Sequence, residues 1–211
     1  MAGNEIIFTI GFDSNGIAIR CQLLPTAHLF VSYIHAVQIR SFYEQLLQEN
    51  IDTISYCLLI GRAANIPELA VGGVLDSYIY DDPEKGTIQQ RAILFTRVHQ
   101  LLKKRATQKK GLKAPVLVFI DDIWQLVPRL NKRNSSILKA LLLDGAAQHI
   151  YLVVGSSLPY RNLLVQLMQP NISKTGPLNE IGAEMIINAD NLIFFRERNR
   201  LEFENYYPKT K

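Results

Sequence analysis

Cysteine is scarce in this chain of 211 residues, and long apolar runs are absent. The two cysteines, Cys21 and Cys57, lie in apolar, strand-like segments, which excludes a disulfide framework and indicates buried thiols of a reducing compartment. No stretch approaches the ~18 to 20 apolar residues that span a bilayer, and the first residues lack the basic and apolar regions of a secretory signal. We therefore expect a soluble cytosolic chain. A hydrophobic content of 48% suffices for one sizeable core, which predicts a single domain over residues 1–211.

Several catalytic and metal-binding patterns are missing as well. The chain contains no Gly-Lys dipeptide and no Gly-x-Gly, so it has neither an intact phosphate-binding loop nor a dinucleotide fingerprint. Residues 155–159 follow a strand-like segment, but they do not form G-x-S-x-G and no acid-base set adjoins them. A zinc site is disfavoured because four histidines lack ligand spacing to cysteines or carboxylates, namely His28, His35, His99 and His149. We predict no catalytic residue and no metal site.

Strand-like and helix-like segments alternate along the chain, which is typical of an α/β sheet flanked by helices. Strand-like runs occupy residues 6–12, 17–23, 27–31, 55–60, 115–120 and 150–154. The first two flank the turn residues 13–16 and predict a hairpin at the edge of the sheet. The aromatic and charged tail over residues 191–204 predicts a second hairpin, at the C-terminal edge.

Three helices are predicted between these strands. Apolar residues at spacings of three and four from Ile39 to Leu47 predict the first helix, directly after the third strand. A second helix is expected from Glu84 to Gln108, and a third is expected to be capped by Ser135. Residues 103–110 concentrate basic charge in a chain whose net charge is +4. Such a run is typical of a solvated helix end, and contact with nucleic-acid phosphates is the less favoured alternative.

The apolar run from Pro115 to Ile120 ends in two carboxylates, Asp121 and Asp122. This layout resembles a Walker B motif, in which a buried strand delivers one carboxylate to Mg²⁺ and a second acid orients the attacking water. In the alternative interpretation, one of the two aspartates simply caps the helix that begins near Ile123. The run alone does not separate the two interpretations.

A Walker B motif requires a phosphate-binding loop of the form G-x-x-x-x-G-K-[ST] between the earlier strand and its helix. Ser32 and Val37 occupy the positions of the glycines, Gln38 that of the lysine, and Ile39 that of the Mg²⁺-binding hydroxyl. A β-branched residue also resists the positive φ angles that such a loop needs. We therefore predict that binding of ATP and Mg²⁺ is absent or very weak, and that the chain uses no cofactor.

Taken together, these features resemble the FtsK/SpoIIIE ATPase family. The resemblance rests on the opening Ile10–Asp13, on the acid-terminated strand Val116–Asp122, and on Ala146–Val154, where small residues and His149 lead into a hydrophobic strand. Within the family, the chain most closely resembles the C-terminal, third ATPase-like module of EssC and EccC, the membrane ATPases of type VII secretion systems. The degenerate phosphate loop is similar to that of the Gram-positive, EssC-like branch.

The resemblance implies a P-loop NTPase-like fold of the RecA/FtsK type, with a mostly parallel sheet flanked by helices. It also implies a cytoplasmic domain of a bacterial cell-membrane protein, which forms part of a longer chain. The implied partners are secreted helical-hairpin substrates, toxins or their adaptors, the other ATPase domains of the same chain, and further copies in a hexamer. Recognition or regulation is the preferred role, because a fold kept without its catalytic loop retains its surfaces for binding.

Two alternatives remain open at this point. One is a weakly active ATPase in which Asp121 and Asp122 work with a loop from a neighbouring subunit. The other is a DNA-binding domain of the FtsK/HerA group, in which basic residues hold phosphates, namely Lys103, Lys104, Arg105, Lys109 and Lys110. Nucleic acid is the less favoured partner because the chain lacks the phosphate loop of a motor.

Overall fold

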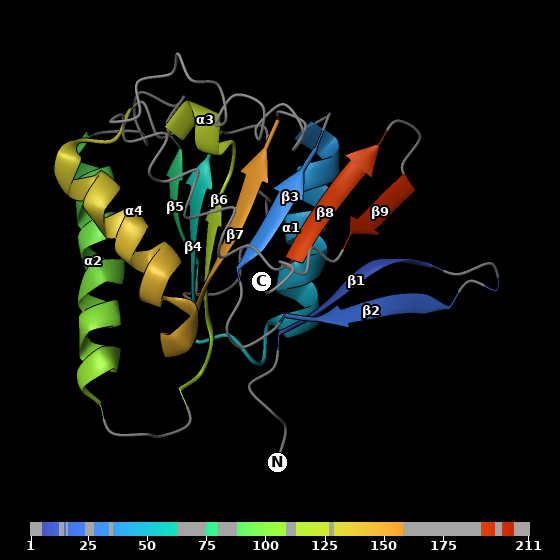
Figure 1. Ribbon diagram of the computed structural model, residues 1–211, viewed down its shortest axis with the longest axis horizontal. Helices are drawn as coiled ribbons and strands as arrows, with labels where there is room; N and C mark the ends of the chain where they lie inside the picture. Colours follow the sequence, from blue (N-terminus) through green and yellow to red (C-terminus); the bar gives the residue numbers. More distant parts are fainter. Residues whose placement is uncertain are drawn as a thin grey trace, which may run out of the picture.

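Seven strands form one sheet in the order β5-β4-β6-β7-β3-β8-β9, as Figure 1 shows. The computed structural model describes residues 6–12, 15, 17–23, 28–33, 36–62, 75–79, 88–108, 113–126, 129–157, 191–196 and 200–204. The strands of the sheet are β3 (Leu29–Ser32), β4 (Tyr56–Gly61), β5 (Leu75–Ile79), β6 (Val116–Ile120), β7 (Ile150–Ser156), β8 (Asn191–Arg196) and β9 (Arg200–Glu204). All neighbouring pairs are parallel except β8 and β9, which confirms the predicted C-terminal hairpin at the sheet edge.

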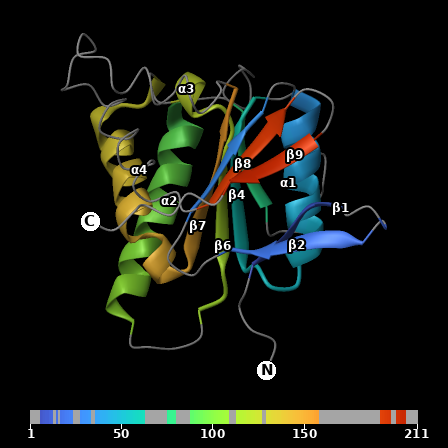
Figure 2. The ribbon, with the colours of Figure 1, turned by 45° about the vertical axis from the view of Figure 1, so that its right-hand side comes forward.

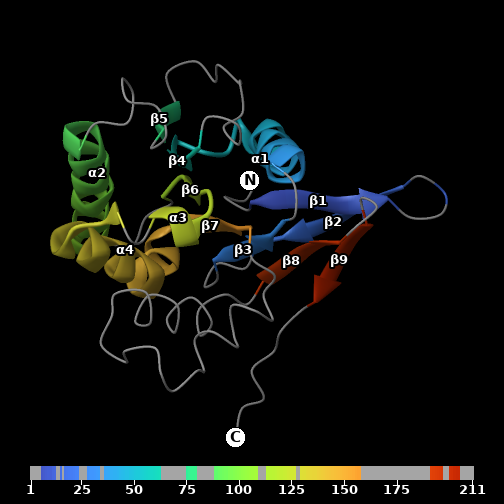
Figure 3. The ribbon, with the colours of Figure 1, turned by 90° about the horizontal axis from the view of Figure 1, so that it is seen from above.

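Helices cover both faces of the sheet, as the views in Figures 2 and 3 show. On one face lie α2 (Ile88–Thr107) and α4 (Lys132–Asp144), and on the other lies α1 (Ala36–Asn50). The short helix α3 (Ile123–Leu126) follows β6, and the 3-10 turn η3 (Ala146–Gln148) joins α4 to β7. None of the described helices combines the length and the apolar content needed to cross a bilayer.

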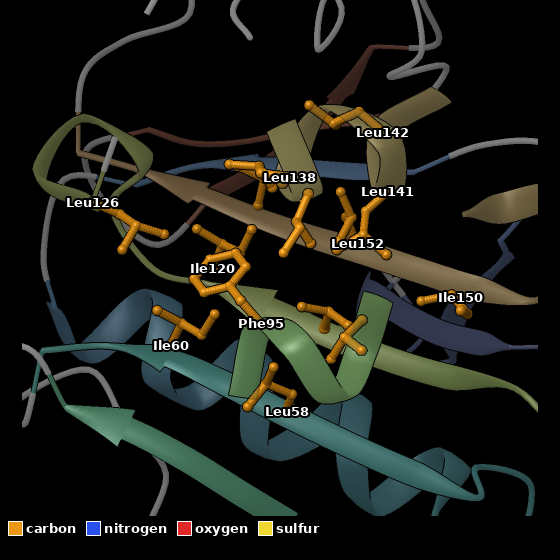
Figure 4. Packing of buried hydrophobic residues seen from close by; sticks show 14 of the residues in the cluster. Leu58, Ile60, Phe95, Ile120, Leu126, Leu138, Leu141, Leu142, Ile150 and Leu152 are labelled. Atoms are coloured by element: carbon orange, nitrogen blue, oxygen red, sulfur yellow. The ribbon is translucent and has the colours of Figure 1, made fainter. Parts of the chain in front are cut away.

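Side-chain alternation along the buried strands produces two hydrophobic cores. In β6, Val118 and Ile120 face α2 and α4, whereas Leu117 and Phe119 face α1. Figure 4 shows the first core, where Phe95 of α2 and the leucines of α4 pack onto the sheet. Each fully buried aliphatic or aromatic side chain contributes about 1.5–3 kcal/mol. Because both faces of β6 are buried, its sequence is continuously apolar rather than alternating.

The N-terminal hairpin departs from the prediction. Strands β1 (Ile7–Phe12) and β2 (Ala18–Gln22) pair only with each other among the described strands, so they form a separate two-stranded sheet and not an edge of the main sheet. Phe8 packs edge-on against Phe42 of α1, and Glu49 accepts a hydrogen bond from the Thr9 amide at 2.9 Å. The hairpin therefore packs its apolar face against α1.

The start of α4 is also different from the prediction. Asn131 caps this helix, since its side-chain oxygen accepts a hydrogen bond from the Asn134 amide at 2.8 Å. Ser135 instead lies within the first turn, and its amide donates to the Asn131 carbonyl at 3.0 Å. Asparagine and serine are comparable caps, so composition alone did not identify the one that is used.

The basic end of α2 is only partly a solvated surface. Lys103 and Lys104 are exposed as predicted, but Arg105 is buried and its guanidinium donates hydrogen bonds to three backbone carbonyls. These acceptors are Gln148 and His149, each at 3.0 Å, and Ala114 at 2.7 Å. Arg105 therefore ties η3 and the approach to β6 to α2. Lys109 and Lys110 lie outside the described residues.

His28 connects β3, β7 and α4 at the centre of the fold. Its Nδ1 accepts a hydrogen bond from the Leu152 amide at 3.1 Å, so Nδ1 carries no proton. Its Nε2 lies 3.1 Å and 3.0 Å from the carbonyls of Leu141 and Leu142, to which it donates. This neutral tautomer is fixed by three backbone groups, and burial lowers the pKa of His28 to about 4.

Acid should therefore destabilise the fold through His28. Because its pKa is lower in the folded chain than the ordinary 6.5, the stabilisation is complete above pH 6.5 and is lost as the pH falls toward 4. The free energy of unfolding should decrease by about 2 kcal/mol between pH 7 and pH 5 through this residue alone. Urea unfolding of the wild type and of His28→Gln at both pH values measures this difference. Equal pH dependence in the two proteins would show that His28 does not titrate this way.

Candidate functional site

The strand order brings four strand ends together at the carboxyl edge of the sheet, which lies uppermost in Figure 1 beside α3. Tyr33 follows β3, Arg62 follows β4, Asp121 and Asp122 follow β6, and Ser157 follows β7. In open α/β sheets, ligands bind at this edge. These five residues, which we call the carboxyl-edge cluster, are therefore the candidate functional site.

Asp121 is fully buried, and its carboxylate is engaged within the cluster. The Tyr33 hydroxyl donates a hydrogen bond to Asp121 Oδ1 at 2.6 Å, a length typical of a charge-assisted bond. The Arg62 amide donates to Oδ2 at 3.4 Å, and the guanidinium Nε lies 3.8 Å from the same oxygen. A buried carboxylate needs such partners, because burial without compensation costs several kcal/mol.

Arg62 and Tyr33 also contact each other. The Arg62 guanidinium donates to the Tyr33 hydroxyl at 3.4 Å, so Tyr33 accepts from one charged group while it donates to the other. Burial and the Asp121 charge raise the pKa of Tyr33, which keeps the hydroxyl protonated as a donor. The three side chains thus form a closed triangle, with hydrogen bonds from Tyr33 to Asp121 and from Arg62 to Tyr33 and an ion pair between Arg62 and Asp121.

Two glycines make this arrangement possible. Tyr33 and Asp121 belong to the ends of β3 and β6, which are separated by β7. A Cβ atom on Gly155 of β7 would lie 3.3 Å from Tyr33 Cε1 and 2.7 Å from the Tyr43 hydroxyl. On the other side, a Cβ atom on Gly61 of β4 would lie 2.7 Å from Asp121 Cβ. The missing side chains leave room for the tyrosine ring to cross β7 and for the Asp121 side chain to lie against β4.

Asp122 has a different environment. Its backbone φ of 49° lies in the left-handed region, which aspartate tolerates better than most residues. Ser157 donates to Asp122 Oδ2 at 2.8 Å, and the Arg62 Nη2 lies 3.9 Å from the same oxygen. Within the described part of the chain, the buried Oδ1 has no hydrogen-bond partner. The Asp122 carboxylate therefore contacts Ser157 and Arg62, the residues that follow β7 and β4, and it does not cap α3.

The positions expected for a phosphate-binding loop lie mostly inside a helix. Ser32 is the last residue of β3, while Val37, Gln38 and Ile39 belong to the first turn of α1. Ile39 is fully buried in the second core, and Val37 is 72% exposed. The side chains of Ser32 and Gln38 lie outside the described residues. Ile39, which was predicted from the sequence at the position of a metal-binding hydroxyl, is thus a core residue.

The Arg62 guanidinium lies within 4 Å of both carboxylates of the cluster, so its positive charge compensates much of their negative charge. Among the described residues, no group of three or more histidine, cysteine or acidic side chains is arranged to hold a metal ion.

Burial also raises the pKa of the Cys57 thiol on β4, so this cysteine is a packing residue, as predicted. The side chain of Cys21 is not among those described.

The sequence did not identify Tyr33, Arg62 or Ser157 as members of the site. The signal that the sequence offered was the position of each residue after a strand. Arg62 and Ser157 directly follow β4 and β7, the two neighbours of β6, and Tyr33 directly follows β3, which lies beside β7. Parallel strands place the residues after their carboxyl ends at one edge. The strand order was required to use that signal, and the order was not known from the sequence.

No protein-family model and no curated protein sequence match this chain significantly, but solved structures do. The chain is similar to the cytoplasmic domain of EssC, with a TM-score of 0.64 and 10% identity over 100% of this chain and 39% of that one. It is similar to Thermomonospora curvata EccC, ATPases 2 and 3, solved in complex with a signal sequence peptide. That match has a TM-score of 0.61 and 11% identity over 92% of this chain and 34% of that one.

A third match is the conjugation coupling protein TcpA of pCW3, solved with ATPγS. Its TM-score is 0.62 at 13% identity, over 91% of this chain and 55% of that one. The predicted P-loop NTPase-like fold, and the resemblance to FtsK-like ATPases, are thus confirmed at the level of the fold. The chain spans only about two fifths of the EssC structure and one third of the EccC structure.

Removal of the Tyr33 hydroxyl should destabilise the fold. In Tyr33→Phe the buried Asp121 carboxylate loses a charge-assisted bond, which predicts a loss of about 1.5–3 kcal/mol in the free energy of unfolding. Tyr43→Phe is a comparison variant, because the Tyr43 hydroxyl donates to the neutral Ile120 carbonyl at 3.5 Å, and loss of such a long bond should change stability by less than about 1 kcal/mol. Chemical denaturation of both variants measures the contrast. Equal losses would contradict a special role for the Tyr33–Asp121 bond.

Proposed function

We propose that the chain is a non-hydrolysing, ATPase-like module of a type VII secretion ATPase, which recognises a secretion substrate or its adaptor, or regulates neighbouring ATPase domains. The observation that carries the proposal is the closed triangle of Tyr33, Asp121 and Arg62. The carboxylate that a Walker B motif would offer to Mg²⁺ is held here by a tyrosine and an arginine.

The energetics of the triangle support loss of the metal-binding role. Before Mg²⁺ could bind Asp121, the carboxylate would have to release the 2.6 Å hydrogen bond from Tyr33. The Arg62 cation would then have to move, because a second positive charge beside the ion is repulsive in a buried site. Phosphate binding would not offset the free-energy cost of either step, because the predicted loop positions lack the glycines, the lysine and the hydroxyl of a phosphate-binding loop.

The structural comparisons support the placement in a secretion system. Two of the similar structures are EssC and EccC. Both solved chains are longer than this chain, and the EccC structure contains ATPases 2 and 3. The EccC structure contains a bound signal sequence peptide, which supports a peptide-binding role for a module of the same fold. The proposal accordingly places this chain in the cytoplasm, as part of a membrane-associated, hexamer-forming ATPase.

The DNA-binding alternative is weakened by Arg105. Three backbone carbonyls occupy its guanidinium, so this residue cannot also serve as an exposed phosphate ligand. The weakly active ATPase retains one supporting observation, which is the buried Asp122 Oδ1 without a partner in the described chain. Asp122 therefore provides the variant that separates the proposed function from this alternative.

Calorimetric titration with Mg-ATP should show no saturable binding at micromolar concentration, and ATP turnover should equal the buffer rate. Asp122→Asn removes the acid that would be needed for hydrolysis while keeping its size, so wild type and variant should give the same baseline. A metal-dependent turnover that disappears in Asp122→Asn would instead support the weakly active ATPase.

Partner capture should be independent of nucleotide. Immobilised wild type and Asp122→Asn should retain equal amounts of helical-hairpin substrates or adaptors, with or without Mg-ATP. Deletion of β8 and β9 is unsuitable for this test, because β8 pairs with β3 inside the sheet. Capture that requires ATP, or that is lost in Asp122→Asn, would contradict a recognition role separate from nucleotide chemistry.

A further inference from the structure

A hollow lies on the outer side of the helical layer formed by α2 and α4. It has a volume of about 420 Å³ and is lined by Ala92, Ile93, Thr96, Arg97, Gln100 and Arg133. Five of these residues follow one stripe of α2, and Arg133 approaches from the first turn of α4, donating to Thr96 Oγ1 at 3.4 Å. The hollow lies on the far side of these helices from the core that they share with the sheet, and it is separate from the carboxyl-edge cluster.

The charge of this layer is strongly one-sided. Helix α2 contains no acidic residue, and α4 contains only Asp144, at its C-terminal end. Both helices carry exposed cations, namely Arg97 and Arg133 in the lining of the hollow and Lys103 further along α2. Partial burial lowers the pKa of His99, and the charges of Lys103 and Arg133 lower it further.

An exposed apolar side chain also lines the hollow. Ile93 lines the hollow and is 61% exposed, although a solvated helix face would normally place a polar residue there. Central apolar contacts surrounded by charged side chains are typical of protein-binding surfaces. A surface that binds the nucleic-acid backbone needs cations and polar groups but gains little from an exposed isoleucine.

We propose that the α2–α4 hollow docks an acidic peptide segment of a protein partner, with one apolar side chain on Ile93 and a flanking carboxylate beside Arg133. The charge complementarity identifies the occupant, and Arg is well suited to paired contacts with carboxylates. This inference deepens the proposed recognition function and rests on it. It assigns the contact to a helical face that needs no nucleotide.

Binding of a copolymer of glutamate and tyrosine tests the proposal, because this probe presents carboxylates around apolar anchors. Fluorescence anisotropy should show saturable binding that Arg133→Glu weakens by about tenfold. Arg20→Glu is the matched control, since it makes the same charge change at an exposed residue of β2, in the layer opposite α2 and α4. Ile93→Ser should weaken binding of the copolymer but leave binding of pure polyglutamate unchanged.

Several results would overturn the docking site. Equal weakening by Arg133→Glu and Arg20→Glu would indicate attraction by net charge alone, and absence of copolymer binding would remove the site. Tighter, Arg133-dependent binding of a short DNA duplex would assign the surface to nucleic acid. Thermal unfolding of each variant, with Arg133→Gln as a milder change, separates lost binding from lost folding. The Mg-ATP titration is independent of this hollow, so failure of the docking site and failure of the non-hydrolysing assignment are distinguishable.

Discussion

The buried charge of Asp121 is the constraint on which the carboxyl edge of this molecule depends. A fully buried carboxylate is costly unless its oxygens are bonded, and here both oxygens accept hydrogen bonds from residues that follow β3 and β4. Tyr33 reaches Asp121 only because Gly155 leaves β7 bare, and the Asp121 side chain fits only because Gly61 leaves β4 bare. The identities of Tyr33, Gly61 and Gly155 are thus linked to the charge of Asp121.

Under the proposed function, the same constraint allows an ATPase-like fold to persist without nucleotide. In an active site of this type, a metal ion compensates the acidic residue at the end of the central strand. Here Arg62 and Tyr33 contact the Asp121 carboxylate and compensate its charge at the end of the central strand. Selection on nucleotide binding would then no longer act on the loop, and a core residue such as Ile39 could be accommodated where a metal ligand would stand. The surfaces of the helical layers remain available for binding.

Periodicity predicted most of the described sheet and the three longer helices, because buried parallel strands and amphipathic helices leave strong apolar patterns. It did not place the first hairpin, which packs on α1 through Phe8 and Phe42, since pairing within a hairpin does not reveal what covers it. The acidic pair was found because two carboxylates after an apolar strand are conspicuous. Arg62 and Tyr33 were missed because their role depends on strand order, which places β7 between β3 and β6 and β4 beside β6. Local sequence does not encode that order.

The most direct test of a closed carboxyl edge is the effect of Mn²⁺-ATP on the amide resonances of the folded protein. Paramagnetic Mn²⁺ broadens the resonances of nuclei near its binding site and substitutes for Mg²⁺ at oxygen ligands. A closed triangle predicts unchanged line widths for the amides of Arg62, Asp121 and Ser157 at micromolar Mn²⁺-ATP. Selective broadening of these three resonances, reversed by excess Mg-ATP, would show that the edge still binds a nucleotide-bound metal and would contradict the account.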